Sequence, residues 1–373
     1  MLLEYSVLEL FGCIIDATED ERLIEILLGI IGNMCCLKET REQLCDAPAV
    51  METILSQLQS PDPLILNQLM RLLNSAILFE NDSDESLWFN HFKNCDDLIE
   101  KFSFILSNST STTLIINTFE ALNAICAKFA IIEISESPKD SRFSQLFVQE
   151  KLIAALIEAF KQVIPSIESD CTSTDLIPTQ NTQKFMNLFL ELNLILSQYE
   201  SISMDAYRSH LSEFHKCLSR ILLPLTQKMH LLPLTSNHQG IIENINDIIQ
   251  ALGDPFDAKC FAHMVIVWKF IEDDKKKTKD SEWDEENDEA TVIDIDDICM
   301  TILEFLTRTG YNCSQSEFEE SVKVLDKDTL KNLFDRVNTD SEDEDEVKCI
   351  SEKLRLSLQT IWNVKPEVKP VNK

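Results

Sequence analysis

One residue type recurs at positions where its chemistry could serve a repeated task. Asparagine stands within four successive amphipathic segments, at Asn33, Asn74, Asn123 and Asn193. A carboxamide both donates and accepts hydrogen bonds, so it can hold the backbone of an extended peptide. These four residues are therefore candidates for binding a partner protein. The alternative is that they hydrogen-bond to neighbouring helix ends and are only structural.

Side chains capable of catalysis or metal binding show no comparable spacing. His210 and His215 are five residues apart, whereas helical ligand pairs need a spacing of three or four to share a face. Cys35 and Cys36 are adjacent and no Cys-x-x-Cys pair occurs. Only 6 of the 373 residues are glycine, and no phosphate-binding loop or nucleophile elbow is present. We therefore expect no enzyme activity, no bound metal and no cofactor.

The chain is strongly acidic, with 64 Asp and Glu residues against 33 Lys and Arg residues and a formal net charge of −31. Clustered positive charge is needed to hold a phosphate backbone, so we expect no direct binding to nucleic acid. A partner chosen by electrostatic attraction would carry a basic segment. Ser341 and Ser281 precede acidic residues, which makes them candidate phosphorylation sites for acidophilic kinases.

The cysteines and the N-terminus indicate the compartment. Most of the 12 cysteines lie among leucines and isoleucines at helical spacing, as small buried apolar residues do. The N-terminal sequence lacks the basic region of a signal peptide, and no run of about 18 apolar residues could span a membrane. Many thiols without a secretory signal indicate a reducing compartment. That compartment is the nucleus or the cytosol, and we expect no membrane association.

Amphipathic helices in successive pairs position the asparagines. From Leu23 to Met34 the apolar residues follow the spacing i, i+3, i+4, i+7, i+8 and i+11, which is one helical face. The prolines of the segment 60–63 end one helix and open the next. No segment shows convincing strand alternation, so the expected fold class is all-α. The other expected pairs are 96–106 with 112–132, 148–164 with 182–199, and 207–223 with 239–252.

The helix pairs repeat with a period that suggests a stacked array. Asn33 and Asn74 are 41 residues apart, within the period of armadillo and HEAT repeats. A shift of 42 residues aligns the apolar positions slightly better, and the later spacings of 49 and 70 require inserts. Short helix pairs must stack to bury their faces. We therefore expect an armadillo- or HEAT-like, right-handed helical superhelix.

The composition changes near residue 272. The segment 272–297 is dense in charge and poor in apolar residues, so it has the character of a linker. Helical patterns return after residue 298 and are interrupted by the acidic run 340–346. The chain begins within an apolar helical pattern, which is consistent with a missing N-terminal cap. The expected layout is a repeat array over 1–271, an acidic linker over 272–297, a C-terminal helical region over 298–363 and a disordered tail over 364–373.

The stretch LCDAPAVMETILSQLQSPDPLILNQLMRLLNSAI, from Leu44 to Ile77, resembles an armadillo repeat. Together with the preceding IIGNMCCLKETREQL, it is similar to the serum amyloid A-like family, which consists of intracellular armadillo-like proteins. The resemblance is best over 20–78 and becomes thinner towards residue 270. It implies a nuclear, non-enzymatic protein associated with cell proliferation. No catalytic motif comes with it.

The expected function is that of a nuclear adaptor whose curved surface binds another protein, with the oligomeric state left open. One alternative is an armadillo-type nuclear transport receptor. In such receptors, which the asparagine positions resemble, a tryptophan stands four residues before each asparagine. This chain has Gly29, Met70, Phe119 and Phe189 there instead. A second alternative is a chaperone cofactor that grips an ATPase domain.

Overall fold

The computed structural model describes residues 7–78, 87–92, 95, 97–133, 141–164, 179–280, 294–339 and 345–362. Nearly all of these residues are helical, and no strand occurs among them. The expected all-α fold class is therefore confirmed. Packing divides the described residues into two compact units, one that ends at His210 and one that begins at Leu211.

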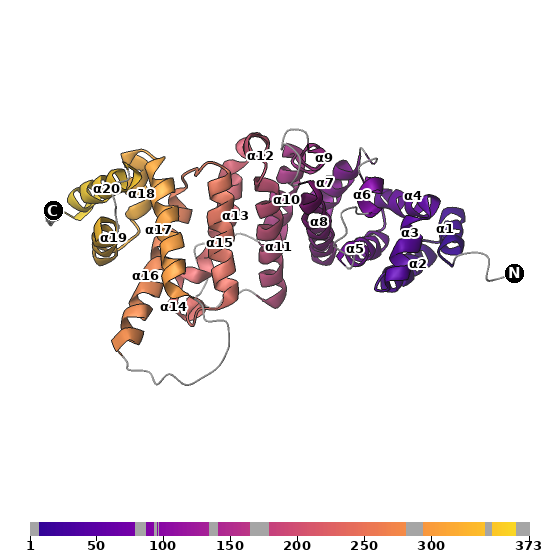
Figure 1. Cartoon of the computed structure of the whole chain (residues 1–373), viewed down its shortest axis with the longest axis horizontal. Coiled ribbons are helices and arrows are strands. Elements are labelled where there is room, and N and C mark those ends of the chain that lie inside the picture. The colour runs from indigo at the N-terminus through magenta and orange to yellow at the C-terminus, as the bar shows by residue number, and fades with distance from the viewer. Residues whose placement is uncertain are drawn as a thin grey trace. The chain divides into compact units, whose positions relative to one another are not determined.

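Four long helices of the first unit pack against one another in chain order (Figure 1). They are α2 (Glu21–Met34), α5 (Pro63–Leu78), α8 (Thr112–Glu133) and α11 (Gln180–Ser197). We call these helices the asparagine row, because each carries one of the four predicted asparagines. A Cβ atom on Gly32 would lie 3.2 Å from the Cα atom of Leu72. Glycine at this position therefore lets α2 approach α5 closely.

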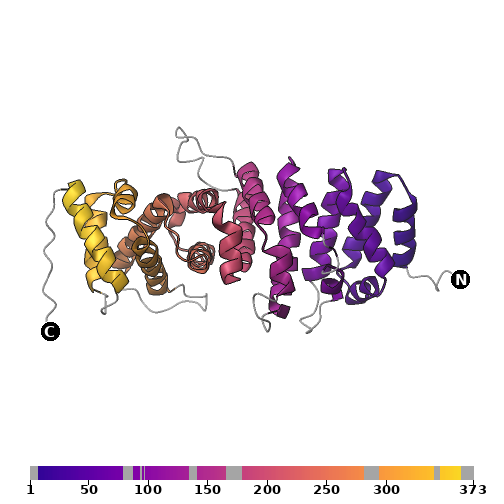
Figure 2. The ribbon, with the colours of Figure 1, turned by 90° about the horizontal axis from the view of Figure 1, so that it is seen from above.

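Shorter helices form a second row in the first unit. They are α1 (Val7–Ala17), α4 (Pro48–Ser56), the 3-10 turn η1 (Gln57–Gln59), α7 (Leu98–Asn108) and α10 (Glu150–Val163). In this row α1 packs on α4, η1 contacts α7, and α7 packs on α10. Figure 2 shows the indigo to magenta helices of this unit side by side. The unit is completed by α3 (Lys38–Cys45), α6 (Leu87–Phe92), α9 (Arg142–Phe147) and α12 (Glu200–Arg208).

The predicted proline turn connects the two rows between η1 and α5. The helical residues before the turn end at Gln59, and α5 begins at Pro63. Proline suits the first position of a helix, because its φ is already helical and its missing N–H would be unpaired there. Asp62 Oδ1 accepts a hydrogen bond from the backbone N–H of Leu64 at 2.8 Å. This carboxylate satisfies one of the unpaired N–H groups at the start of α5.

The second unit is arranged around one long helix, α16 (Ala258–Asp280). It packs against α13 (Leu211–Leu222), α17 (Ile295–Tyr311) and α18 (Gln315–Val322). Nζ of Lys353 donates to the carbonyl oxygens of Gly310 and Cys313, at 2.7 and 2.6 Å. This lysine stabilises the C-terminal end of α17, where carbonyl groups lack helical partners. The remaining elements are η3 (Leu223–Thr226), α14 (Lys228–Leu231), α15 (Ser236–Ala251), α19 (Lys327–Thr339) and α20 (Asp345–Trp362).

The structure differs from the expected layout at the acidic linker. Helix α16 continues to Asp280, and α17 begins at Ile295, so both ends of the segment 272–297 are helical. Buried residues such as Trp268 and Ile271 anchor α16 up to the start of the charged segment, and the helix extends from there. The compact units also divide after His210 rather than near residue 271. Residues 281–293 lie outside the described residues, so the linker prediction for them stays a prediction.

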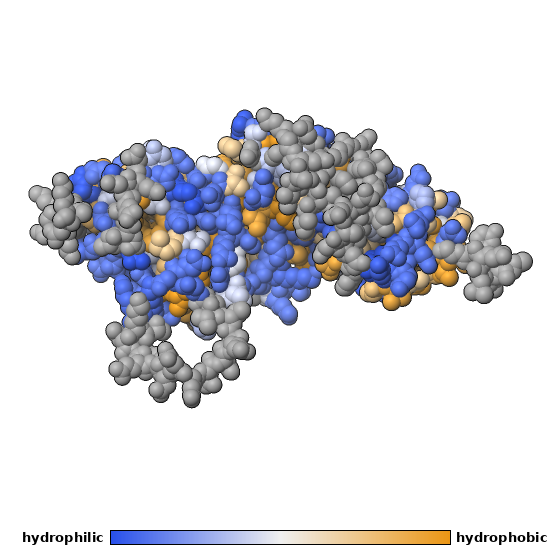
Figure 3. All heavy atoms as spheres, viewed as in Figure 1, coloured by the Kyte–Doolittle hydropathy of each residue, from blue (hydrophilic) through white to orange (hydrophobic). Residues whose placement is uncertain are grey.

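Other predicted features also fall partly outside the described residues. Both candidate phosphorylation sites, Ser281 and Ser341, and the tail 364–373 lie there. The acidic run 340–346 is described only from Asp345, where α20 begins. In the described part, no helix is long and apolar enough to cross a membrane. Figure 3 shows many hydrophilic residues on the face it displays, as expected for a chain with a net charge of −31.

Candidate functional site

Two of the four predicted asparagines, Asn123 and Asn193, are buried in the asparagine row. Asn193 is 1% exposed, and its Oδ1 accepts a hydrogen bond of 2.6 Å from the hydroxyl of Tyr207. Its Nδ2 donates to the carbonyl of Phe189 at 2.7 Å. Asn123 is 9% exposed, and its Nδ2 donates to the carbonyl of Leu188 on the neighbouring α11 at 2.9 Å. These bonds tie α11 to α12 and α8 to α11, which is the structural role.

The other two asparagines lie nearer the solvent. Asn33 is exposed at the end of α2, and Asn74 is half-buried on α5. The four residues therefore do not form one exposed ladder along the row. The structure places each of them on a helix of the same row and leaves only Asn33 and Asn74 accessible to solvent, so their partner-binding role stays a prediction.

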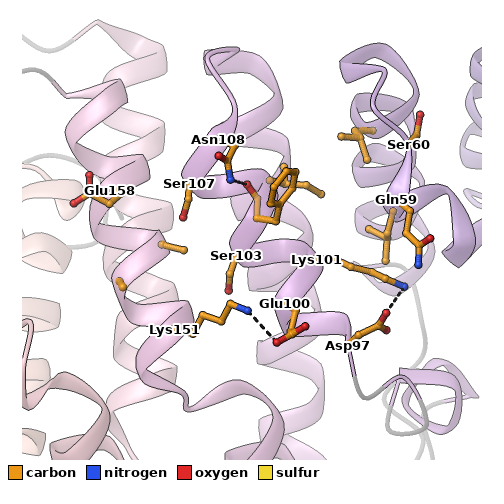
Figure 4. Close-up of a pocket in the computed structure, with 16 residues that line it drawn as sticks. Gln59, Ser60, Asp97, Glu100, Lys101, Ser103, Ser107, Asn108, Lys151 and Glu158 are labelled. Atoms are coloured by element: carbon orange, nitrogen blue, oxygen red, sulfur yellow. Dashed lines mark hydrogen bonds and ion pairs between the residues drawn. The ribbon is translucent and has the colours of Figure 1, made fainter.

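A hollow of about 630 Å³ opens on the second row of the first unit (Figure 4). Its walls come from η1, α5, α7 and α10, and it adjoins a narrower hollow of about 270 Å³ beside the proline turn. We call the two hollows together the α7 groove. Five residues line both hollows: Ser60, Leu66, Phe104, Ile105 and Asn108.

Phe104 is the most exposed large apolar residue of α7, with 68% of its surface accessible. The buried stripe of this helix includes Leu98, Phe102 and Ile105, and Phe104 falls outside it. Phe104 shares its face with Glu100, four residues earlier, because residues i and i+4 are neighbours on a helix surface. Phe104 was not identified from the sequence. An aromatic residue outside the apolar stripe of a helix indicates an exposed apolar side chain, so its exposure could have been predicted.

Charged residues surround the wider hollow in pairs (Figure 4). Lys101 lies 3.0 Å from Asp97, and its side chain is only 15% exposed. The hydrogen bond from Lys101 holds the pKa of the Asp97 carboxyl below its usual range. Lys151 of α10 lies 3.0 Å from Glu100, and both of these side chains are more than half exposed. Exposed pairs of this kind contribute about 0–1 kcal/mol, so a ligand can exchange with them easily.

Ser103 also lines the wider hollow, and its side chain is buried. Figure 4 shows it on the side of α7 that faces α10. Among the described residues, its hydroxyl has no hydrogen-bond partner. A buried hydroxyl without a partner destabilises the fold, because its hydration is lost without compensation.

The charged groups that line the α7 groove are held in ion pairs. No histidine or cysteine of the described part lines it, and each of its carboxylates, Asp97, Glu100 and Glu158, is paired with a lysine. A general acid at neutral pH needs a raised carboxyl pKa, whereas the pKa of Asp97 is lowered. Within the described ranges, no three His, Cys, Asp or Glu side chains gather as possible metal ligands.

In the second unit, the side chains of His215, Asp257 and Cys260 lie close together. Nδ1 of His215 lies 4.0 Å from Asp257, and the thiol of Cys260 donates to the carbonyl of His215 at 3.4 Å. Burial raises the pKa of the Cys260 thiol well above its ordinary value of 9.0 and lowers the pKa of His215. A thiol that stays protonated is a poor nucleophile, so the cluster has the properties of packed core.

Comparison with known proteins supports the resemblance inferred from the sequence. No family model matches the chain. The human protein named SAAL1 is 23% identical to it over 173 residues, which is 43% of this chain and 35% of that protein. The Danio rerio saal1 protein is 25% identical over 168 residues, 43% of this chain and 34% of that protein. The expected similarity to the serum amyloid A-like proteins is therefore confirmed.

These matches are partial. The chain spans about a third of the length of the curated relatives that it matches. Among solved structures, one engineered protein aligns with 81% of this chain at 10% identity and a TM-score of 0.46. A second engineered protein also covers 81% of this chain, at 14% identity and a TM-score of 0.42.

Proposed function

We propose that this chain is a non-enzymatic adaptor that binds a segment of another protein in the α7 groove. The observation that carries the proposal is Phe104, an aromatic side chain that is 68% exposed where two hollows meet. Aromatic residues set in concave surfaces supply much of the binding free energy of protein interfaces. The groove also has charged and hydroxyl groups around this side chain, which can fix the orientation of a bound segment.

The arrangement of the first unit supports the proposal. We propose that its two rows form an armadillo-like, right-handed superhelix, since the long helices pack on one another in chain order. In such stacks each repeat contacts only its neighbours, and the array offers an extended surface to a partner. The resemblance to SAAL1 proteins supports the same fold assignment, because the sequence resemblance implies armadillo-like structure.

We propose the nucleus as the site of action, with a link to cell proliferation that rests on the family resemblance alone. None of the cysteines in the described part forms a disulfide, which is consistent with a reducing compartment. The net charge of −31 supports a basic partner segment over nucleic acid.

The nuclear transport receptor is a weaker candidate than the adaptor. Such a receptor needs exposed aromatic side chains four residues before its asparagines. At these positions Met70, Phe119 and Phe189 are completely buried, and Gly29 has no side chain. No surface for the stem of a lysine is therefore offered along the asparagine row at these positions.

The test is quantitative affinity capture from a nuclear extract with the wild-type chain and two variants. Phe104→Ala removes the aromatic anchor, and Leu78→Ala removes a side chain of similar exposure that does not line the groove. We expect a set of proteins that wild type and Leu78→Ala retain and Phe104→Ala loses. Identical sets from all three chains would contradict the proposal.

A further inference from the structure

We infer that the α7 groove takes an arginine side chain that a partner protein presents next to an apolar residue. This inference rests on the proposed function and names the chemistry of the bound segment. The two hollows of the groove differ in character, and Phe104 lies between them.

The first step concerns the face of α7 that carries Phe104 and Glu100. These residues are four positions apart, so an aromatic ring and a carboxylate are neighbours on the exposed surface. An arginine is the side chain that matches both groups at once. Its planar guanidinium stacks on aromatic faces and forms two parallel hydrogen bonds with a carboxylate.

The second step concerns charge in the wider hollow. Three carboxylates line it, from Asp97, Glu100 and Glu158, against the two lysines Lys101 and Lys151. Each of the three carboxylates is paired with a lysine: Asp97 with Lys101, Glu100 with Lys151 and Glu158 with Lys161. The side chains of Glu100 and Glu158 are 66% and 56% exposed, so an arginine can compete with their lysine partners. The net charge of −31 adds a long-range attraction for cations.

The third step concerns the narrower hollow. No charged residue of the described part lines it. Its apolar walls come from Pro61, Pro63, Leu66 and Leu114, together with Phe104. An apolar side chain adjacent to the arginine would be removed from water there, which is favourable.

Other cations and anions fit this surface less well. Lysine is compact and strongly hydrated, so it gains less from an aromatic face and cannot bond a carboxylate with a planar fork. An anionic segment, such as a phosphopeptide, would face Asp97, Glu100 and Glu158 in a chain that is already acidic. Both occupants are outcomes that the experiment below separates.

The experiment begins with selection from a random peptide library displayed on phage, with the full chain immobilised. We expect enrichment of arginine directly beside an aliphatic or aromatic residue. An enriched peptide is then synthesised with a fluorescent label, and its affinity is measured by anisotropy. Replacing its arginine with citrulline, which keeps the shape and removes the charge, should weaken binding about tenfold or more. Replacing it with lysine should give an intermediate loss.

Variants of the chain locate the peptide. Phe104→Leu keeps an apolar side chain and removes the ring, so it should weaken the arginine peptide and leave the citrulline peptide nearly unchanged. Glu100→Gln and Glu158→Gln should weaken the arginine peptide, whereas Leu78→Ala should bind it like wild type. Thermal unfolding followed by circular dichroism verifies that each variant is folded before its affinity is compared.

Each other outcome has a definite meaning. Enriched peptides that lack arginine, or a citrulline peptide that binds as tightly, would overturn the inference. If those peptides still depend on Phe104, the proposed function survives. Binding that is indifferent to Phe104→Ala and Phe104→Leu overturns both. A selection that enriches no peptide, or only acidic or lysine-bearing peptides, overturns the arginine inference.

Discussion

The asparagine row and the exposed face of α7 reverse the usual placement of polar and apolar side chains. On α11 the polar Asn193 is almost completely buried, whereas on α7 the aromatic Phe104 is 68% exposed. The hydroxyl of Tyr207 explains the first case, because it donates to Asn193 at 2.6 Å and compensates for lost hydration. Phe104 lies outside the buried stripe of its helix, so no core packing holds it. Asn193 can be buried because another side chain satisfies its hydrogen bonds. Phe104 stays exposed because no neighbouring helix of the described part packs against it.

The largest effect is expected for Asn193→Ala. The change removes the acceptor of the Tyr207 hydroxyl and the donor to the carbonyl of Phe189. We expect a loss of about 2–3 kcal/mol in the free energy of unfolding, because buried polar groups lose their partners. Urea denaturation followed by circular dichroism measures it. Asn74→Ala, on the half-buried position of α5, is the matched control and should change stability little.

The next effect tests the same hydrogen bond from its other side. Tyr207→Phe keeps the buried ring and removes only the hydroxyl, so we expect a loss of about 1–2 kcal/mol. The double variant with Asn193→Ala should lose less than the two single variants together, since they share one bond. Strict additivity in this double-mutant cycle would show that the bond does not hold α12 to α11.

Asn123→Ala should have a smaller effect, of about 1 kcal/mol. Its Nδ2 donates to the carbonyls of Phe119 and Leu188, at 3.1 and 2.9 Å, whereas its Oδ1 has no partner among the described residues. Unlike Asn193→Ala, this change leaves no buried tyrosine hydroxyl without its acceptor. Hydrogen exchange measured by mass spectrometry should report faster exchange in α8 and α11 and no change in the second unit. A loss as large as that of Asn193→Ala would mean that Asn123 is more fully bonded than the structure describes.

The sequence predicts the helices well because their signals are local. The spacing from Leu23 to Met34 and the prolines at 61 and 63 depend only on neighbouring residues, and the helices α2 and α5 follow them. The extension of α16 to Asp280 was not predicted, because the charged residues after Ile271 have the composition of a linker. The buried residues Trp268 and Ile271 just before them hold the helix in place, so it continues into the charged segment.

The site was harder to predict, because it depends on contacts between helices. The repeated asparagines were correctly placed on one row of helices, but Asn193 is buried by Tyr207, fourteen residues later, on another helix. Nothing in the spacing of the asparagines indicates that partner. The exposed Phe104 could have been identified from its position off the apolar stripe of α7. The groove around it could not, since its walls come from η1, α5, α7 and α10, which are separate in the sequence.

Ser103→Ala should raise the stability of the fold, whereas the substitutions at Asn193, Tyr207 and Asn123 should lower it. The hydroxyl is buried and has no hydrogen-bond partner within the described part of the chain. Removing it relieves a desolvation penalty, and alanine is also the better helix former. We expect a gain of about 0.5–1 kcal/mol, seen as a higher urea midpoint with an unchanged m-value. A loss of stability would mean that the hydroxyl is bonded in solution.

The smallest effect on stability is expected where the effect on binding is largest, at Phe104. The side chain is 68% exposed and outside the buried stripe of α7, so Phe104→Ala should change the free energy of unfolding by no more than about 0.5 kcal/mol. The same change should remove the binding of a partner segment, because the groove loses its aromatic side chain.

Asn193→Ala should give the converse result: it weakens the fold but leaves binding unchanged, since Asn193 does not line the groove. Both variants are therefore measured for urea midpoint and for partner binding at a temperature where wild type and variants are folded. If Phe104→Ala unfolds as readily as Asn193→Ala, the ring belongs to the core. If Asn193→Ala also abolishes binding while folded, the asparagine row takes part in recognition and the two regions are not separate.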